Sequence, residues 1–189
     1  MDPQPRACAL IGHFSEPRIA ESALAVLAAL GRRGAGALVP DDEPGEFGPL
    51  AQRVPRAELA TQADFMIAVG GDGTLLQAAR LVVGRNVPLL GINRGRLGFL
   101  TDVMPQDVAG SINALLDGRC ESDRRPLLEA HLHNATGEQA RLLAYRCAWR
   151  LDQAGLKRGQ AGVTGLQDIA RAGVLLLNRL RRDTKRLSR

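Results

Sequence analysis

One carboxylate stands among glycines where an apolar run ends, and this combination suits phosphate chemistry. The segment Gly70–Thr74 reads Gly-Gly-Asp-Gly-Thr and directly follows the apolar residues Phe65–Val69. Glycine lets the backbone approach an anion closely, and a helix that begins here directs its N–H groups and positive dipole end at the same place. A carboxylate beside phosphates is electrostatically unfavourable, so its presence indicates a chemical role. Asp72 is therefore expected either to accept a proton from an attacking hydroxyl or to hold a divalent metal ion.

A second glycine-rich block, Gly91–Asp102, follows another apolar run. Its three glycines predict a loop that lies against a ligand or against another stretch of backbone. Two arginines of this loop, Arg94 and Arg96, have the donors to bind phosphate or ribose-linked oxygens. They are equally well explained as solvated charges of a surface loop, so both alternatives stay open.

Two common nucleotide-binding motifs are excluded. A P-loop needs a Gly-Lys-Ser/Thr ending, and the chain has no lysine before Lys157. The Gly-x-Gly-x-x-Gly motif of dehydrogenases is not met, because Leu76 stands where its third glycine belongs. The glycine turn therefore belongs to another class of nucleotide-binding site.

Strands and helices alternate over the first hundred residues or so. Continuous apolar runs predict buried strands at residues 7–11, 36–39, 63–69 and 87–92. Between two of these strands, residues 40–57 are rich in Asp, Glu, Gly and Pro, which is typical of an exposed and mobile loop.

Three helices are predicted between and after these strands. The first follows a cap at Ser15 with Pro17 in its first turn, the second begins with the capping box Thr74–Gln77, and the third covers Asp102–Leu116. Alternation with short turns predicts an α/β fold, an open, mostly parallel Rossmann-like sheet flanked by helices. Ligands of such folds bind at the carboxyl ends of strands, where Gly73 and Asn93 are expected to lie.

The second part of the chain has a different pattern. Alternating apolar residues on both sides of the turn-like segment Asn134–Gly137 predict a short antiparallel strand pair over residues 127–145. Residues 165–187 have the pattern of a basic amphipathic helix. The predicted organisation is an α/β nucleotide-binding domain over residues 1–126, the start of a truncated β-rich domain over 127–145, and a divergent basic tail over 146–189, either helical or disordered.

Composition points to a globular protein of the cytoplasm. The chain has 189 residues, of which 45% are hydrophobic and 24% charged. We expect no signal peptide and no membrane span, because no apolar run approaches about 18 residues. The three cysteines have no metal-ligand spacing, which favours a reducing compartment. His131 and His133 lack a third ligand, so no metal site is predicted within the chain.

Charge is divided unevenly along the sequence. Residues 141–189 hold 12 of the 25 basic residues but only 3 of the 20 acidic ones, so this segment carries +9 whereas residues 1–140 carry −4. Such asymmetry indicates either an interaction tail for an anionic partner or a solvated basic face. The solvated face is the commoner case, and a nucleic-acid partner is not expected.

The two glycine blocks together resemble those of the NAD kinases. Residues Gly70–Leu76 match the signature of this family, and Gly91–Asp102 match its second motif nearly letter for letter. The opening residues Ala9–His13 and Ala20–Ser22 resemble the family's first strand and helix, so the resemblance covers about residues 5–145. Diacylglycerol and sphingosine kinases share the glycine turn but lack the second block, which makes a lipid kinase the more distant alternative.

The resemblance implies an α/β domain followed by a larger β-rich domain, and the synthesis of NADP from NAD and ATP. By this match Asp72 is the catalytic proton acceptor for the 2′-hydroxyl of the adenosine ribose. Gly73 and Thr74 lie against phosphates, and three residues line the adenosine pocket, namely Asn93, Phe99 and Leu100. Mg²⁺ or another divalent cation arrives with ATP. The full-length architecture is expected to form a homo-oligomer.

The resemblance breaks after the predicted strand pair. The family has an Asn-Asp or Asn-Glu pair after a Leu-Ala-Tyr-like strand end, but here Leu143–Tyr145 is followed by Arg146 and Cys147. A later Thr-Gly-Ser-Thr-Ala turn of the family is absent from the sequence. Our hypothesis is that residues after about 145 are out of register, as a frameshift leaves them. The alternatives are a short paralogue with a new basic tail, and a truncated, catalytically inactive nucleotide-binding remnant.

Overall fold

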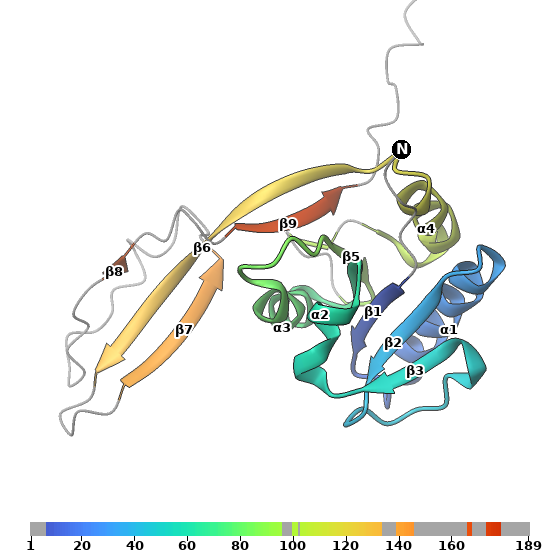
Figure 1. Ribbon diagram of the computed structural model, residues 1–189, viewed down its shortest axis with the longest axis horizontal. Coiled ribbons are helices and arrows are strands. Elements are labelled where there is room, and N and C mark those ends of the chain that lie inside the picture. The colour runs from blue at the N-terminus through green and yellow to red at the C-terminus, as the bar shows by residue number, and fades with distance from the viewer. Residues whose placement is uncertain are drawn as a thin grey trace, which may run out of the picture.

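The computed structural model describes residues 7–95, 100–101, 103–133, 139–145, 166–167 and 173–178. Strands alternate with helices up to residue 93, as the apolar runs predict (Figure 1). The elements are β1 (Ala7–Gly12), α1 (Pro17–Arg32), β2 (Gly36–Pro40), β3 (Ala51–Val54), α2 (Leu59–Gln62), β4 (Phe65–Gly70), α3 (Asp72–Val82), β5 (Leu89–Asn93), α4 (Val108–Leu116), β6 (Glu121–His133), β7 (Gln139–Tyr145), β8 (Leu166–Gln167) and β9 (Gly173–Asn178).

Five strands form a parallel sheet in the order β3-β2-β1-β4-β5. The chain builds outward from β1 to β3, then returns to the other side of β1 with β4, so the strand order reverses between β1 and β4. The register places Gly12 beside Val69 and Gly70 beside Asn93. The carboxyl ends of β1, β4 and β5 therefore meet at one edge of the sheet, and the predicted Rossmann-like architecture is confirmed.

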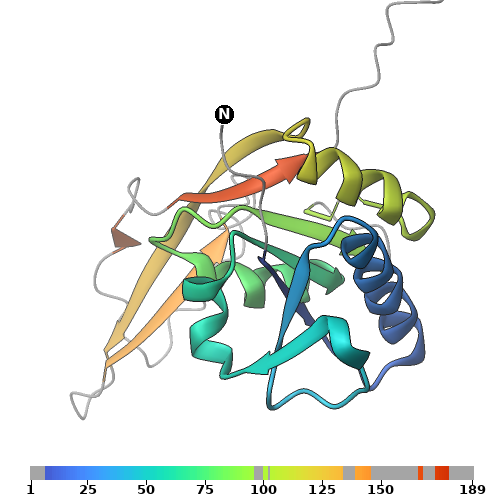
Figure 2. The same cartoon turned by 45° about the vertical axis from the view of Figure 1, so that its right-hand side comes forward.

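Helices cover both faces of this sheet (Figure 2). Alternate residues of β4 point to opposite faces: Phe65, Ile67 and Val69 join the core under α1 and α4, whereas Met66 and Ala68 join the core under α2 and α3. Burial on both faces is the reason that these strands read as continuous apolar runs rather than as alternating ones.

The acidic segment of residues 40–57 is more ordered than its composition predicts. It contains β3, which extends the sheet by pairing in parallel with β2. Arg56 then fastens the segment, since its guanidinium lies 2.8 Å from Asp42 and 2.9 Å from Glu43. The expectation of a loop is wrong for Ala51–Val54, because backbone pairing with β2 makes these residues a strand although they lack a continuous apolar run.

Helix starts differ from the predicted caps. The N-cap of α1 is Glu16 rather than Ser15, and α3 begins at Asp72 behind the N-cap Gly71, so that Thr74 lies inside the first turn. Neither helix has a side-chain cap. The third predicted helix is a short 3₁₀ turn at Pro105–Asp107 followed by α4.

The predicted strand pair is present as β6 and β7. Leu128 lies opposite Ala144 and Ala130 opposite Leu142, in antiparallel register. β6 is a single 13-residue strand that passes without a break through the expected boundary at residue 126. Its first half pairs with β9 and its second half with β7, which extends away from the parallel strands in the view of Figure 1.

The helix hypothesis for residues 165–187 is wrong where the structure describes them. Leu166–Gln167 form β8, and Gly173–Asn178 form β9, which lies between β5 and β6. The run Val174–Leu177 is uninterruptedly apolar, which is the pattern of a strand between two neighbours rather than of one helix face. Within the described residues, no helix has the length and hydropathy that crossing a membrane requires.

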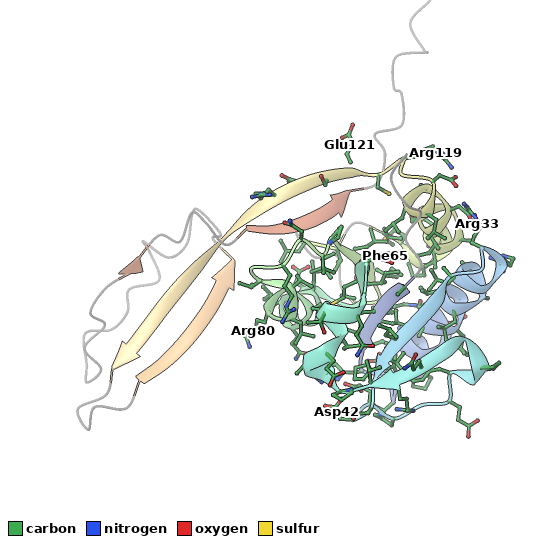
Figure 3. All side chains as sticks on the ribbon, viewed as in Figure 1. Arg33, Asp42, Phe65, Arg80, Arg119 and Glu121 are labelled. Carbon is green, nitrogen blue, oxygen red and sulfur yellow. The ribbon has the colours of Figure 1, made fainter. Side chains whose placement is uncertain are left out.

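An ion-pair cluster joins the ends of α1 and α4. Arg33 Nη2 lies 2.6 Å from Asp117 Oδ1, and Arg119 Nη2 lies 2.6 Å from Asp117 Oδ2. Arg33 also donates a hydrogen bond of 3.1 Å to Asn113 Oδ1. Figure 3 shows Arg33 and Arg119 on the same side of the molecule. The hydrogen bonds from Arg119 and Arg33 lower the pKa of Asp117.

We predict that Asp117→Asn lowers the stability of the fold at neutral pH and has little effect in acid. A depressed folded-state pKa contributes stability above the pKa of the unfolded chain, about 3.9 for Asp, and this is lost as pH falls through the folded-state value. Urea unfolding from neutral pH to about pH 2 measures the difference between wild type and variant. Glu46→Gln, which removes an exposed carboxylate elsewhere, is the control. A difference that stays constant across this range contradicts the prediction.

Candidate nucleotide site

The turn between β4 and α3 is shaped by Gly70. This residue has a φ of +157°, and a Cβ built on it would lie against the Thr74 hydroxyl and 2.8 Å from Thr74 Cβ. The first intrahelical bond of α3 runs from the Leu75 N–H to the Gly71 carbonyl (3.1 Å). The amides of the residues before Leu75 therefore have no acceptor within the helix. The turn thus presents backbone donors at the positive end of the α3 dipole.

The second glycine block lies directly beside this turn. The Arg94 N–H donates a hydrogen bond of 2.9 Å to the Gly70 carbonyl. A Cβ built on Gly95 would lie 3.7 Å from the Gly71 Cα. Because Gly70 and Asn93 are also partners in the β4–β5 ladder, the two motifs form one continuous edge, as their places after neighbouring strands predict.

Asp72 lies half-buried at this edge, at the first position of α3. Its Oδ1 accepts a hydrogen bond of 3.2 Å from the Leu100 N–H, although the two residues are 28 positions apart in the chain. Asp72 therefore faces the β5 side of the turn and borders the second block. This hydrogen bond from a backbone donor fixes the orientation of the carboxylate.

Gly73 and Thr74 occupy different environments. Gly73 is exposed, and a Cβ built on it would meet no atom within 4 Å, so the backbone is open to a ligand there. Thr74 is only 8% exposed and packs under Gly70. The Thr74 side chain therefore supports the turn. The resemblance implies contact between Thr74 and phosphate, and only its backbone amide is placed for such a contact.

Asn93 is buried at the end of β5, with 4% of its surface exposed. Its Oδ1 accepts a hydrogen bond of 3.0 Å from the Gly95 N–H, and its own N–H donates to the Val103 carbonyl (2.8 Å). Asn93 thus shapes the loop that faces Asp72. Leu100 is half-buried and contacts Asp72, whereas the third predicted pocket residue, Phe99, lies outside the described residues.

Arg94 has a role that neither sequence alternative foresees. Its guanidinium donates to Glu21 Oε2 at 2.9 Å and to the Ser22 hydroxyl, both on α1. The side chain is 18% exposed, so it is neither a solvated charge nor an open phosphate ligand. Arg94 ties the second block to α1, a contact across more than 70 residues that local sequence cannot indicate. Arg96 lies outside the described residues.

A pocket of about 340 Å³ opens on the other side of the glycine turn, at the end of β1. Its polar lining comes from His13, Glu43, Arg56, Gln77 and Arg80. Ile11 and Leu81 supply apolar surface. The sequence did not indicate a ligand site at Gln77 or Arg80, because the pocket exists only once β1, α3 and the segment before α2 are assembled.

Among the side chains that the structure describes, no group of three or more His, Cys, Asp or Glu could hold a metal ion. His131 and His133 lie two positions apart on β6, opposite Arg141 and Gln139. Their side chains are outside the described set.

A doubly wound sheet with an open glycine turn, a helix N-terminus behind it and an oriented carboxylate is the arrangement typical of nucleotide-binding α/β domains. Comparison with known proteins specifies it further. Residues 49–120 match the ATP-NAD kinase N-terminal domain. The NAD kinase of Methylococcus capsulatus is 44% identical over 132 residues, which cover 70% of this chain and 46% of that protein. The NAD kinase of Chromohalobacter salexigens is 43% identical over 129 residues, 67% of this chain and 43% of that protein.

A solved structure has the same fold. The crystal structure of yeast NADH kinase complexed with NADH superposes with a TM-score of 0.63 at 18% identity, covering 76% of this chain and 47% of that chain. The chain is thus similar to the NAD kinases, and residues 49–120 match the N-terminal domain of that family, in agreement with the resemblance of the two glycine blocks. It spans about half the length of the curated relatives it matches.

We predict that Gly70→Ala destabilises the fold by about 1–3 kcal/mol, the cost of a sparsely allowed backbone conformation, because its Cβ collides with Thr74. Gly73→Ala is the matched control. It lies in helical backbone with open space around it, so its stability should be unchanged or higher by up to about 1 kcal/mol. Urea unfolding of the two variants measures this difference, and equal stabilities would show that Gly70 is not required for the turn.

Proposed function

We propose that the protein carrying this chain is an NAD kinase, which transfers the γ-phosphoryl group of ATP to the 2′-hydroxyl of the adenosine ribose of NAD and thereby produces NADP. The observation that carries the proposal is the position of Asp72. It is a half-buried carboxylate at an open glycine turn, oriented toward the β5 side where Asn93 and Leu100 lie. The family match and the relatives named NAD kinase support the substrates.

In the proposed reaction Asp72 is the proton acceptor. The ribose oxygen forms a bond to the γ-phosphorus while its proton passes to the Asp72 carboxylate. The bond between this phosphorus and the β–γ bridging oxygen breaks, and ADP leaves. The Leu100 N–H holds the carboxylate in place. The exposed backbone at Gly73, at the N-terminal end of α3, is suited to phosphate oxygens.

Binding of the adenosine is proposed on the β5 side of the turn. There Asn93 and Gly95 form a loop that faces the glycine motif, and Leu100 adds apolar surface beside Asp72. Phe99 belongs to this proposal through the family resemblance.

Mg²⁺, or another divalent cation, is proposed to accompany ATP. Mg²⁺ is usually bound largely through substrate phosphates, so the phosphates of ATP would supply its ligands. When bound, the ion would neutralise charge on the phosphates.

We also propose a cytoplasmic location and a homo-oligomeric full-length protein. Cys8 and Cys120 are free thiols, which suits a reducing compartment, and burial raises the pKa of both. The oligomer rests on the family resemblance alone.

We predict that Asp72→Asn lowers NADP formation from NAD and ATP by about 10²- to 10⁴-fold, the usual contribution of a general base. NAD affinity should change much less, because the amide keeps the shape of the side chain. Enzymatic detection of NADP and calorimetric titration with NAD measure the two quantities. Asp41→Asn, at an exposed position of the same charge, should behave as wild type.

Two outcomes contradict the proposal, and each excludes a different part of it. Equal activity of wild type and Asp72→Asn removes Asp72 from the chemistry. Binding of NAD by wild type without any NADP formation supports the alternative, a nucleotide-binding remnant without catalysis.

A further inference from the structure

Arg94 joins three elements that are far apart in the chain. Its backbone N–H donates a hydrogen bond of 2.9 Å to the Gly70 carbonyl at the end of β4. Its guanidinium donates to Glu21 Oε2 at 2.9 Å and to the Ser22 hydroxyl, both on α1. Arg94 directly follows β5 and begins the second glycine block. This one residue therefore links the loop after β5 both to the glycine turn and to the helix that covers the sheet face opposite α3.

Of the two partners on α1, Ser22 is the firmer anchor. It is only 1% exposed, on the buried face of a 16-residue helix. A buried hydroxyl is costly without a hydrogen-bond partner, and Arg94 Nε supplies one. The side chain of Glu21 is exposed, and exposed ion pairs contribute little because water and salt screen them. The position of the Arg94 side chain is therefore set mainly by a residue of the core.

The loop that Arg94 begins also returns to β5. The Asn93 N–H donates to the Val103 carbonyl at 2.8 Å, and the Val103 N–H donates to the Gly91 carbonyl at 3.2 Å. These two bonds close the loop at its base, where Ile92 and Val103 form a parallel bridge. A closed base still leaves the loop free to tilt about it. The bonds of Arg94 to Gly70 and to α1 lie beyond the base, and they fix the direction in which the loop leaves the sheet.

The same loop carries the donor that orients the proposed proton acceptor. The Leu100 N–H donates to Asp72 Oδ1 at 3.2 Å. A carboxylate side chain has several staggered rotamers, so a donor on a separate loop selects the one that points toward it. Tilting the loop moves this donor and leaves the Asp72 carboxylate without a fixed direction. The path from Ser22 to Asp72 therefore runs through Arg94 and the loop.

We propose that Arg94 is a positioning residue for the phosphoryl transfer: seated on Ser22, it holds the loop so that the Leu100 N–H stays on the Asp72 carboxylate. Its effect on catalysis passes through Asp72. The proposal rests on the proposed function for the chemistry at Asp72. The positioning itself is a property of the free protein, and it is measurable without substrates.

A double-mutant cycle on kcat for NADP formation by the full chain tests whether Arg94 acts through Asp72. Arg94→Ala is expected to lower kcat about 10- to 100-fold, the effect of a reacting group that is misplaced by about an ångström. In the Asp72→Asn background the same change should lower kcat less than about twofold, because residues that act as a unit are not additive. An equal loss in both backgrounds, or no loss in the wild-type background, overturns the proposal.

Arg85→Ala is the matched control for the cycle. It removes the same charge from an exposed position just beyond α3, and it should leave kcat unchanged in both backgrounds. Urea unfolding verifies that every variant is folded under the conditions of the assay.

Further variants separate positioning from a general structural role. Arg94→Lys keeps the charge, but one ammonium group cannot reproduce the planar fork that reaches Glu21 and Ser22 together. Its kcat should therefore lie between those of Arg94→Ala and wild type. Ser22→Ala should lower kcat more than Glu21→Gln, because the buried hydroxyl sets the position of Arg94. The opposite order overturns the role assigned to Ser22, and with it the proposal.

Hydrogen exchange at the Leu100 amide measures the positioning in the free protein. An N–H that is bonded to a carboxylate exchanges when that bond opens, and local opening is detected separately from global unfolding. Arg94→Ala is expected to raise the exchange rate of this amide about tenfold or more, while the amides of β4 keep their wild-type rates. An unchanged rate at Leu100 overturns the proposal, as does an equal increase at Leu100 and throughout β4, which marks a loss of overall stability.

The two measurements also separate this inference from the proposed function. If NADP forms but Arg94→Ala changes neither kcat nor the exchange of Leu100, the positioning role fails and the kinase proposal stands. If no NADP forms but the exchange of Leu100 rises specifically in Arg94→Ala, the positioning of the Asp72 carboxylate stands and the kinase proposal fails.

Discussion

The site depends on the absence of a side chain at residue 70. Thr74 fills the space that a Cβ there would need, which lets α3 begin immediately after β4 and leaves its first amides facing outward. The carbonyl of the same glycine accepts the Arg94 N–H, and this bond brings the loop after β5 against the turn. Without this close packing Asp72 and Leu100 would not meet, and the carboxylate would have no fixed direction.

The parts of the fold that the sequence predicts are those governed by local pattern. Continuous apolar runs place β1, β2, β4 and β5 within a residue or two, since each run is buried on both faces. β3 escapes detection because Gln52 and Arg53 are exposed on an edge strand, so its pairing with β2 rather than its own hydropathy makes it a strand. The capping box at Thr74 is overridden by the geometry of the glycine turn. β9 was missed although Val174–Leu177 form a continuous apolar run, because the basic residues around this run were interpreted as the polar face of a helix.

The residues of the candidate site also differ in whether local sequence pattern predicts them. Asp72, Gly73 and Asn93 follow directly from their places after strands, and the structure brings them together with Leu100. The tie from Arg94 to α1 and the Arg80 pocket depend on side chains from separate elements, which spacing along one chain segment cannot indicate. The glycine turn thus has a half-buried carboxylate toward β5, whereas the exposed guanidinium of Arg80 lies one face of α3 away, at the pocket at the end of β1.

The tie between Arg94 and α1 has a consequence for how the loop after β5 responds to its surroundings. The side chain of Glu21 is 74% exposed, so dissolved ions readily screen its attraction to Arg94. The Ser22 hydroxyl has no net charge, so salt screens its hydrogen bond with Arg94 less. Raising ionic strength therefore loosens one of two anchors and leaves the other in place. Arg94 is therefore expected to stay against α1 in high salt through its bond to Ser22, even where its ion pair with Glu21 is weakened.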